Sequence, residues 1–123
     1  MYIYILRCED NSLYTGIAVD LEKRIRQHLG LINGGAKYTR SHPVKYIEAV
    51  WFTDSDSDAR KLEYKLKRLT HAQKEELIVF PSLLFKFLPD DIADCKFEYI
   101  DSETYNIEFN FMKGQVYDKR NCN

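Results

Sequence analysis

The chain has 123 residues, the length of one compact domain. Hydrophobic residues make up 45% and charged residues 30%, which excludes intrinsic disorder and fits a globular protein with its own core. The net charge of −1 does not indicate a nucleic-acid-binding protein, but residues 1–78 carry 13 basic and 11 acidic side chains, a balance that permits a local basic surface there.

The cysteines and the apolar segments indicate the cellular compartment of the protein. Cys8, Cys95 and Cys122 are an odd number without paired spacing, which argues against a disulfide framework and against a zinc site. The amino-terminal residues lack the basic start of a signal peptide, and the longest apolar region, residues 77–88, is interrupted by Pro81. We therefore expect a soluble, cytoplasmic protein with reduced thiols and no membrane segment.

The first predicted elements are two strands joined by a turn. Residues 2–8 are β-branched and aromatic, which predicts a strand buried on both faces. Residues 9–12 are typical of a turn, and residues 13–19 then predict the second strand of a hairpin. Gly16 inside this strand indicates a bulge or a close approach by another backbone or a ligand.

A helix is predicted next, over residues 21–29. Asp20 is a good N-cap residue, and Gly30 marks the end. Arg24 and His28 are four residues apart, so they share a stripe beside the apolar face. That face consists of Leu21, Ile25 and Leu29.

The middle of the chain predicts a loop, a strand and two helices. Residues 30–43 are rich in glycine and are expected to form a loop, and residues 44–52 alternate as a third strand does. A helix is predicted over residues 57–69. A short helix should follow Thr70, because Thr70 and Gln73 have the spacing of a capping box.

The carboxyl-terminal part predicts a β-hairpin. Residues 95–101 and 105–114 alternate polar and apolar side chains on either side of a turn-like segment. We expect residues 1–80 to form the main domain and residues 81–123 to form a β-rich extension packed on it. The predicted fold is α/β: a small three-stranded, mainly antiparallel sheet flanked by helices, with a C-terminal β-hairpin extension.

Several motifs follow one another in an informative order. Tyr2-Ile3-Tyr4 is followed nine residues later by Tyr14-Thr15-Gly16, then by Arg24 and His28, and later by the segment ARKLEYKLK at residues 59–67. The order and spacing resemble the GIY-YIG nuclease family over residues 1–78, most of all its small stand-alone members, whose corresponding segment often reads like residues 34–45 here. The resemblance implies a GIY-YIG-like fold.

The resemblance also implies site residues. Tyr4 and Tyr14 correspond to the two motif tyrosines; Tyr4 is expected to act as the base, and Tyr14 to position water or phosphate. Arg24 and His28 correspond to the polar face of the first helix. Glu63 corresponds to the glutamate that holds one divalent metal ion, Mg²⁺ or Mn²⁺.

Three departures from the family pattern stand out. Tyr2 replaces the first motif glycine, and Thr15 replaces the second motif isoleucine; neither position carries chemistry. Many family nucleases also have an asparagine downstream of the glutamate, and residues 64–77 contain none. That absence puts part of the catalytic pocket in question.

Phosphodiester hydrolysis explains why these residue types occur together. The guanidinium fork of Arg24 matches phosphate geometry, and one carboxylate is enough for Mg²⁺, which keeps several waters. Tyrosine has an ordinary pKa of about 10, so Tyr4 needs a nearby cation to act as a base. His28 could share the proton, because its ordinary pKa lies near neutrality.

Each residue also has a purely structural interpretation. Tyr4 and Tyr14 could be core residues, Arg24 and His28 could lie on a solvated helix face, and Glu63 could pair with Lys67. Their co-occurrence in family order favours the functional interpretation.

Nucleic-acid contacts are predicted in the loop. Lys37, Tyr38 and Arg40 combine phosphate-binding and base-stacking side chains, although an ordinary packed loop explains them equally well. Lys61, Lys65 and Arg68 form a further basic stripe, which a solvated helix face explains better.

The sequence therefore predicts a metal-dependent endonuclease that hydrolyses phosphodiester bonds in DNA or a related nucleic acid, of the kind used in DNA repair or recombination. The alternative is a weakly catalytic or non-catalytic nucleic-acid-binding module of the same fold. A third hypothesis is that the C-terminal extension contacts a protein partner or a second copy of the chain.

Overall fold

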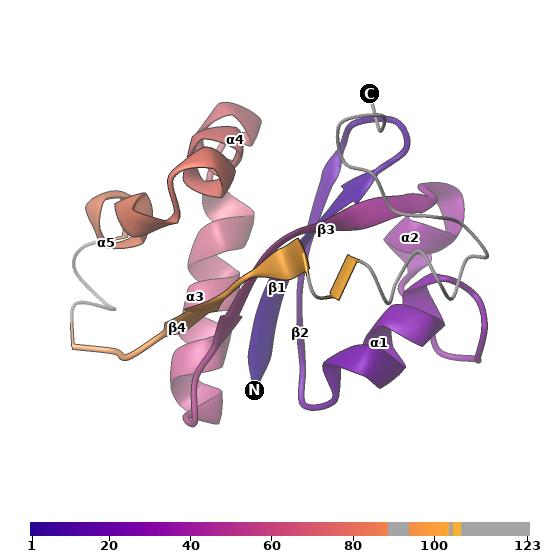
Figure 1. The fold of residues 1–123 in the computed structure, drawn as a ribbon, viewed down its shortest axis with the longest axis horizontal. Helices are drawn as coiled ribbons and strands as arrows, with labels where there is room; N and C mark the ends of the chain where they lie inside the picture. Colours follow the sequence, from indigo (N-terminus) through magenta and orange to yellow (C-terminus); the bar gives the residue numbers. More distant parts are fainter. Residues whose placement is uncertain (89–93, 104, 107–123) are drawn as a thin grey trace.

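A computed structural model describes residues 1–88, 94–103, 105 and 106. In this part of the chain, four strands form one antiparallel sheet in the order β2-β1-β3-β4, with helices on both sides (Figure 1). The strands are β1 (Tyr2–Cys8), β2 (Leu13–Ala18), β3 (Val44–Phe52) and β4 (Glu98–Ile100).

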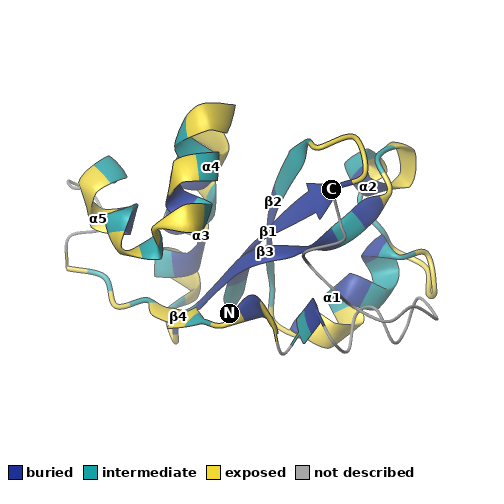
Figure 2. Cartoon of the chain, turned by 45° about the horizontal axis from the view of Figure 1, so that its top comes forward, coloured by how far each residue is buried: buried dark blue, intermediate teal, exposed yellow. Residues whose placement is uncertain are grey.

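β1 is a central strand of the sheet. It pairs with β2 on one side and with β3 on the other, so Tyr4 lies opposite Gly16 in β2 and opposite Val50 in β3. Helices cover both faces, so β1 and most of β3 are buried (Figure 2). The prediction of a strand buried on both faces is confirmed for residues 2–8.

The helices divide between the two faces (Figure 1). α1 (Leu21–His28) and α2 (Lys37–Ser41) lie on one side. The other side carries α3 (Asp56–Arg68), α4 (His71–Val79), the 3₁₀ turn η1 (Pro81–Leu83) and α5 (Leu84–Phe87). Alternate residues of β1 therefore enter two cores: Ile3 and Ile5 pack with α3 and α4, while Tyr4 and Leu6 pack with α1.

The helix caps agree with the sequence. The Asp20 carboxylate accepts a hydrogen bond from the backbone N–H of Lys23, and Thr70 and Gln73 form the predicted capping box at the start of α4. The helices predicted over 21–29 and 57–69 are confirmed, with ends shifted by one residue.

Two predictions about the sheet and its connections were wrong. The structure has four strands rather than three, because β4 pairs with β3. The segment expected to be a loop contains α2, five residues long. The second arm of the predicted C-terminal hairpin falls almost entirely on residues 107–114, which lie outside the described part of the chain.

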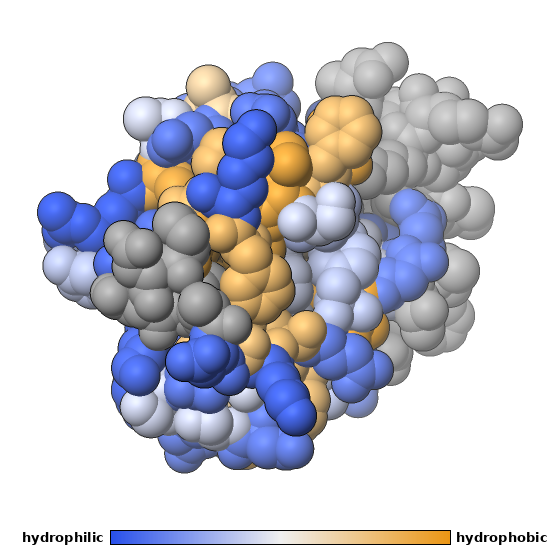
Figure 3. All heavy atoms as spheres, turned by 90° about the vertical axis from the view of Figure 1, so that its left-hand side faces the viewer, coloured by the Kyte–Doolittle hydropathy of each residue, from blue (hydrophilic) through white to orange (hydrophobic). Residues whose placement is uncertain are grey.

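The side formed by α3, α4, α5 and β4 exposes several apolar side chains among charged ones (Figure 3). The exposed large apolar residues there are Tyr64, Val79, Phe80, Phe85 and Tyr99. Within the described residues, no helix has the length and apolar character that crossing a membrane requires.

Candidate active site

The hydroxyl of Tyr4 is the centre of the candidate site. Tyr4 is fully buried on the α1 side of the sheet, directly opposite Gly16. A Cβ atom at position 16 would lie 2.5 Å from the Tyr4 hydroxyl oxygen, closer than any side chain tolerates. Gly16 thus permits a close approach by the Tyr4 side chain, rather than the bulge or the approach of a backbone or ligand that the sequence suggested, and the register of β1 with β2 has no shift.

His28 lies at the other side of this hydroxyl. The Tyr4 oxygen is 2.7 Å from Nε2 of His28, and Nδ1 of His28 is 2.9 Å from the Thr39 hydroxyl in α2. His28 is buried at the end of α1, where the i, i+4 spacing from Arg24 brings both to the site. The side chain predicted to share the proton thus contacts the tyrosine predicted to act as base.

The electrostatics of this pair differ from the sequence-based expectation. Burial, followed by the nearby Tyr14, raises the pKa of Tyr4 above its ordinary value, and Arg24 lowers it by less. Burial, followed by the charge of Arg24, lowers the pKa of His28 to about 4. At neutral pH the free protein therefore has a neutral tyrosine beside a neutral histidine.

Tyr14 begins a row of rings next to this pair. Its ring meets the edge of the His28 ring at 5.2 Å and stacks on Tyr38 at 5.7 Å. Tyr38 in turn stacks on His42 at 4.0 Å, and Nδ1 of His42 is 2.7 Å from the Asp10 carboxylate. Unlike Tyr4, Tyr14 is partly exposed.

Arg24 lies between α1 and the loop that follows it. Its guanidinium donates hydrogen bonds to the Gln27 side-chain oxygen at 2.9 Å and to the Gly34 carbonyl at 2.6 Å. Both acceptors are neutral oxygens, so these bonds fix the side chain and leave its positive charge able to attract an anion.

Glu63 lies on α3, on the other side of the sheet. Its charge is the weakest of the influences on the pKa of Tyr4, and α3 packs against β1 and β2. Glu63 also pairs with Lys67 at 3.4 Å, the structural alternative considered from sequence. Both side chains are partly exposed, so this ion pair is weak enough to rearrange.

The donor set fits a single magnesium ion better than a closed metal site. In the described part of the chain, no three His, Cys, Asp or Glu side chains come together as metal ligands. Mg²⁺ is commonly held by one or two carboxylates, with water and phosphate oxygens completing the shell. The partly exposed carboxylate of Glu63 meets that requirement.

The three residues predicted to contact nucleic acid all lie on α2. Lys37 and Arg40 are exposed on α2, and Tyr38 belongs to the stacked rings. Arg40 lines a hollow of about 550 Å³ whose wall includes His28 and Thr39. Residues 37–40 therefore lie next to the buried, hydrogen-bonded side chains of Tyr4, His28 and Thr39.

Sequence reasoning missed three residues that contact this group. Thr39 lies between the predicted Tyr38 and Arg40 but was not singled out, and Asp10 and His42 are 32 residues apart. No pattern in the sequence links Asp10 to His42; only the fold brings them together.

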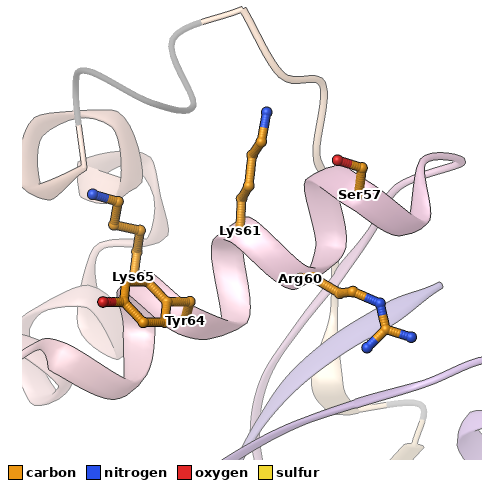
Figure 4. A pocket seen from close by; sticks show the side chains of 5 residues that line it. All are labelled: Ser57, Arg60, Lys61, Tyr64 and Lys65. Atoms are coloured by element: carbon orange, nitrogen blue, oxygen red, sulfur yellow. The ribbon is translucent and has the colours of Figure 1, made fainter.

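A second basic surface lies on α3. Ser57, Lys61, Tyr64 and Lys65 line a hollow together with Arg60. Lys61 and Lys65 point away from the sheet, whereas Arg60 extends on the other side of the helix (Figure 4). These side chains are predominantly exposed, as expected for a solvated helix face.

Comparisons with known proteins identify the family of the chain. A family model described as the GIY-YIG catalytic domain matches residues 1–76. The chain is similar to a UPF0213 protein of Fusobacterium nucleatum, at 47% identity over 69% of this chain and 83% of that protein. A UPF0213 protein of Clostridium perfringens is 48% identical over 67% of this chain and 86% of its own. The solution NMR structure of a UPF0213 protein of Bacillus halodurans is 40% identical, covers 63% of this chain and 81% of that chain, and has a TM-score of 0.42.

Proposed function

The chain belongs to the GIY-YIG catalytic domain family, a family of nucleases, and we propose that it is a metal-dependent endonuclease that hydrolyses phosphodiester bonds in DNA or a related nucleic acid. One observation carries the proposal: the Tyr4 hydroxyl lies 2.7 Å from Nε2 of His28, so two residues that match the family pattern meet at one point. Arg24 lowers the pKa of Tyr4 and Glu63 raises it, as side chains near this hydroxyl would.

The two tyrosines would have different roles toward the attacking water. Tyr14 is partly exposed and would hold the water or the phosphate, as expected from the motif. Tyr4 would take up the proton, in contact with His28. Tyr4 reaches no solvent in the free protein, so the partly exposed side chains beside it must shift when substrate binds.

Arg24 would bind the scissile phosphate. Two neutral oxygens already hold its guanidinium, so the side chain is oriented before substrate arrives. A guanidinium can also stabilise the charge that accumulates on the phosphoryl oxygens in the transition state.

Glu63 would hold the metal ion, either Mg²⁺ or Mn²⁺. The bound ion would act as a Lewis acid toward the phosphate and the leaving oxygen. The carboxylate must leave Lys67 to do so, and an exposed i, i+4 ion pair of this kind stabilises a helix by only about 0.3–0.5 kcal/mol.

The substrate strand would lie along α2. Lys37 and Arg40 would contact phosphates, and Tyr38 would offer a ring next to Tyr14. DNA repair or recombination is the process in which such an activity would be used.

A nicking assay on supercoiled plasmid with Mg²⁺ or Mn²⁺ tests the activity. We expect the wild type to cut, and Tyr4→Phe and Glu63→Gln to lose about 100-fold or more. Glu22→Gln, which removes an exposed carboxylate from α1, should cut like the wild type.

The rival function is a nucleic-acid-binding module that does not cut. Two observations favour it: residues 64–77 contain no asparagine, and Lys67 neutralises Glu63. Equal traces of cutting in the wild type and both variants, together with DNA binding in a gel-shift assay, would establish this rival and refute the nuclease.

A protein contact through the C-terminal extension, including a homodimer, is a separate proposal. Its support is that β4 lies at the edge of the described sheet, a position where a further strand can add. Size-exclusion chromatography with light scattering over a range of concentrations tests it. A constant mass of 14.6 kDa would exclude the homodimer.

A further inference from the structure

Three hydrogen bonds connect Tyr4 in β1 to the backbone of α2. The Tyr4 oxygen lies 2.7 Å from Nε2 of His28, and Nδ1 of His28 lies 2.9 Å from the Thr39 hydroxyl oxygen. The Thr39 hydroxyl donates to the carbonyl oxygen of Ala36 at 3.2 Å. All three side chains are buried, and the two bonds made by His28 are shielded from competition with water, whereas the bond to Ala36 is partly buried.

The directions of these bonds follow from the last one. A carbonyl oxygen can only accept, so the single hydroxyl proton of Thr39 is directed to Ala36. With that proton used at Ala36, the Thr39 oxygen would accept from His28, and the imidazole proton would lie on Nδ1. A neutral imidazole has one N–H group, so Nε2 accepts and the Tyr4 hydroxyl donates.

We propose that Thr39 is a positioning residue, which holds His28 in the Nδ1–H tautomer so that Nε2 accepts the proton of Tyr4. The inference rests on the proposed nuclease function for its catalytic meaning. With its proton directed to His28, Tyr4 presents only oxygen lone pairs to any other partner, and those are the groups that accept a proton from the attacking water.

The proton transfer that this arrangement permits is balanced. One O–H bond of the water breaks and a new O–H bond forms on Tyr4, while the original Tyr4 O–H bond breaks and an N–H bond forms at Nε2 of His28. The products are a hydroxide that attacks phosphorus and an imidazolium. Tyr4 is neutral before and after, so no tyrosinate has to exist in the free protein.

The charge of the substrate helps His28 to accept this proton. The positive charge of Arg24 disfavours protonation of His28 in the free protein. A phosphodiester bound to Arg24 would offset that charge, so His28 would become more basic when substrate is in place.

The tautomer can be measured directly by long-range ¹H–¹⁵N NMR of the full chain. The chain has three histidines, and the signals absent from a His28→Gln variant identify His28. We expect a protonated Nδ1 and an unprotonated Nε2 in the wild type. A protonated Nε2 in the wild type would overturn the proposal, whether or not the protein cuts DNA.

Two substitutions at position 39 distinguish the effect of the Thr39 hydroxyl group from the effect of its side-chain packing. Thr39→Val keeps the shape but cannot accept a hydrogen bond, so His28 should lose its single tautomer and the nicking rate should fall at least about tenfold. Thr39→Ser keeps the hydroxyl and should restore both. An unchanged tautomer in Thr39→Val, with the fold intact by backbone NMR, would refute the positioning role. The expected tautomers without any cutting would instead refute the nuclease function alone.

Discussion

Position 16 in β2 has no room for a side chain, because an added Cβ atom would lie 2.5 Å from the Tyr4 hydroxyl oxygen. Tyr4 is fully buried and bonded to His28, so it has no room to withdraw. Gly16→Ala should therefore lower the free energy of unfolding by about 1–3 kcal/mol, as overpacking does. It should also abolish nicking by displacing the hydroxyl; urea unfolding and the plasmid assay measure the two effects.

Gly30 supplies the matched control for that substitution. Its φ is +76° and no atom lies within 4 Å of an added Cβ, so Gly30→Ala strains the backbone without touching the site. We expect a loss of about 1 kcal/mol in stability and unchanged nicking by the folded protein. Equal losses of activity in both variants would mean that reduced stability, rather than the Tyr4 contact, is responsible.

His28 should make the stability of the protein depend on pH. Burial and Arg24 lower its pKa to about 4 in the folded protein, from 6.5 in the unfolded chain. Between these values the unfolded chain binds the proton and the folded protein does not, so stability falls as the pH falls from 6.5 toward 4. The shift corresponds to about 3 kcal/mol, which urea unfolding at pH 7, 5.5 and 4 would reveal.

The His28→Gln variant identifies the source of that dependence. Glutamine cannot titrate, so the loss between pH 6.5 and 4 should shrink by most of its size. Aspartate and glutamate have reference pKa values of about 3.9 and 4.3, so they titrate mainly in the lower part of this range and leave the upper part to histidine. An identical pH dependence in wild type and variant would contradict the assignment.

At the scale of elements, local pattern predicted most of the sheet and helices but not the shortest ones. β1, β2 and β3 follow from runs of β-branched and aromatic residues, and the ends of α1 and α4 follow from Asp20 and Thr70. α2 was missed because its N-cap residue, Ala36, makes no side-chain hydrogen bond and glycines precede it. β4 lies within residues 95–101, which were predicted as the first arm of a hairpin, but its pairing with β3 was not predicted.

An ion-pair cluster attaches α4 to the sheet. The Arg7 guanidinium in β1 contacts both carboxylate oxygens of Glu75 in α4 and lies 3.2 Å from the Glu48 carboxylate in β3. Arg7 and Glu48 are buried, whereas the Glu75 side chain is 38% exposed. The hydrogen bond from Arg7 lowers the pKa of Glu75.

Arg7→Met should therefore destabilise the protein strongly. It leaves the buried Glu48 carboxylate without its arginine, a situation that typically costs about 3–5 kcal/mol. Glu75→Gln should cost much less, because Arg7 keeps Glu48 and Glu75 is partly solvated. Urea unfolding at pH 7 measures both variants.

Arg26→Met is the matched control, since Arg26 forms an exposed i, i+4 pair with Glu22. It should change the unfolding free energy by no more than about 0.5 kcal/mol. If Arg7→Met lowered the free energy of unfolding as little as Arg26→Met, the ion-pair cluster would not be what holds α4 against the sheet.

At the scale of the whole molecule, the proposed site would draw its residues from both faces of the sheet. Arg24 and His28 approach Tyr4 from the α1 side, whereas Glu63 comes from α3, which packs against β1 and β2 (Figure 1). Residues 4 and 63 are far apart in sequence, and no helix or strand period relates them. The family resemblance could suggest this set of residues, but Thr39 and the pair of Asp10 and His42 required the folded chain.

The distribution of charge over the molecule predicts which side nucleic acid occupies. The net charge is only −1, so binding must depend on local clusters, and Lys37 and Arg40 lie on the site side of the sheet. Each phosphate contact adds about 0.9 to the steepness with which log K falls with log salt. Lys37→Ala combined with Arg40→Ala should therefore reduce that slope by about 2, measured by fluorescence anisotropy on a short duplex without divalent metal.

Lys86 provides the control on the opposite side of the sheet, in α5. Lys86→Ala removes an exposed charge of the same kind, yet it should leave the slope unchanged, because a duplex held at Tyr14 and Arg24 does not extend to α5. Lys61→Ala tests the basic surface of α3 in the same way. The slope could instead fall for Lys86→Ala or Lys61→Ala but not for the α2 variant. That result would place the nucleic acid on the α3 side, away from Tyr4 and Tyr14, and would refute the α2 docking surface.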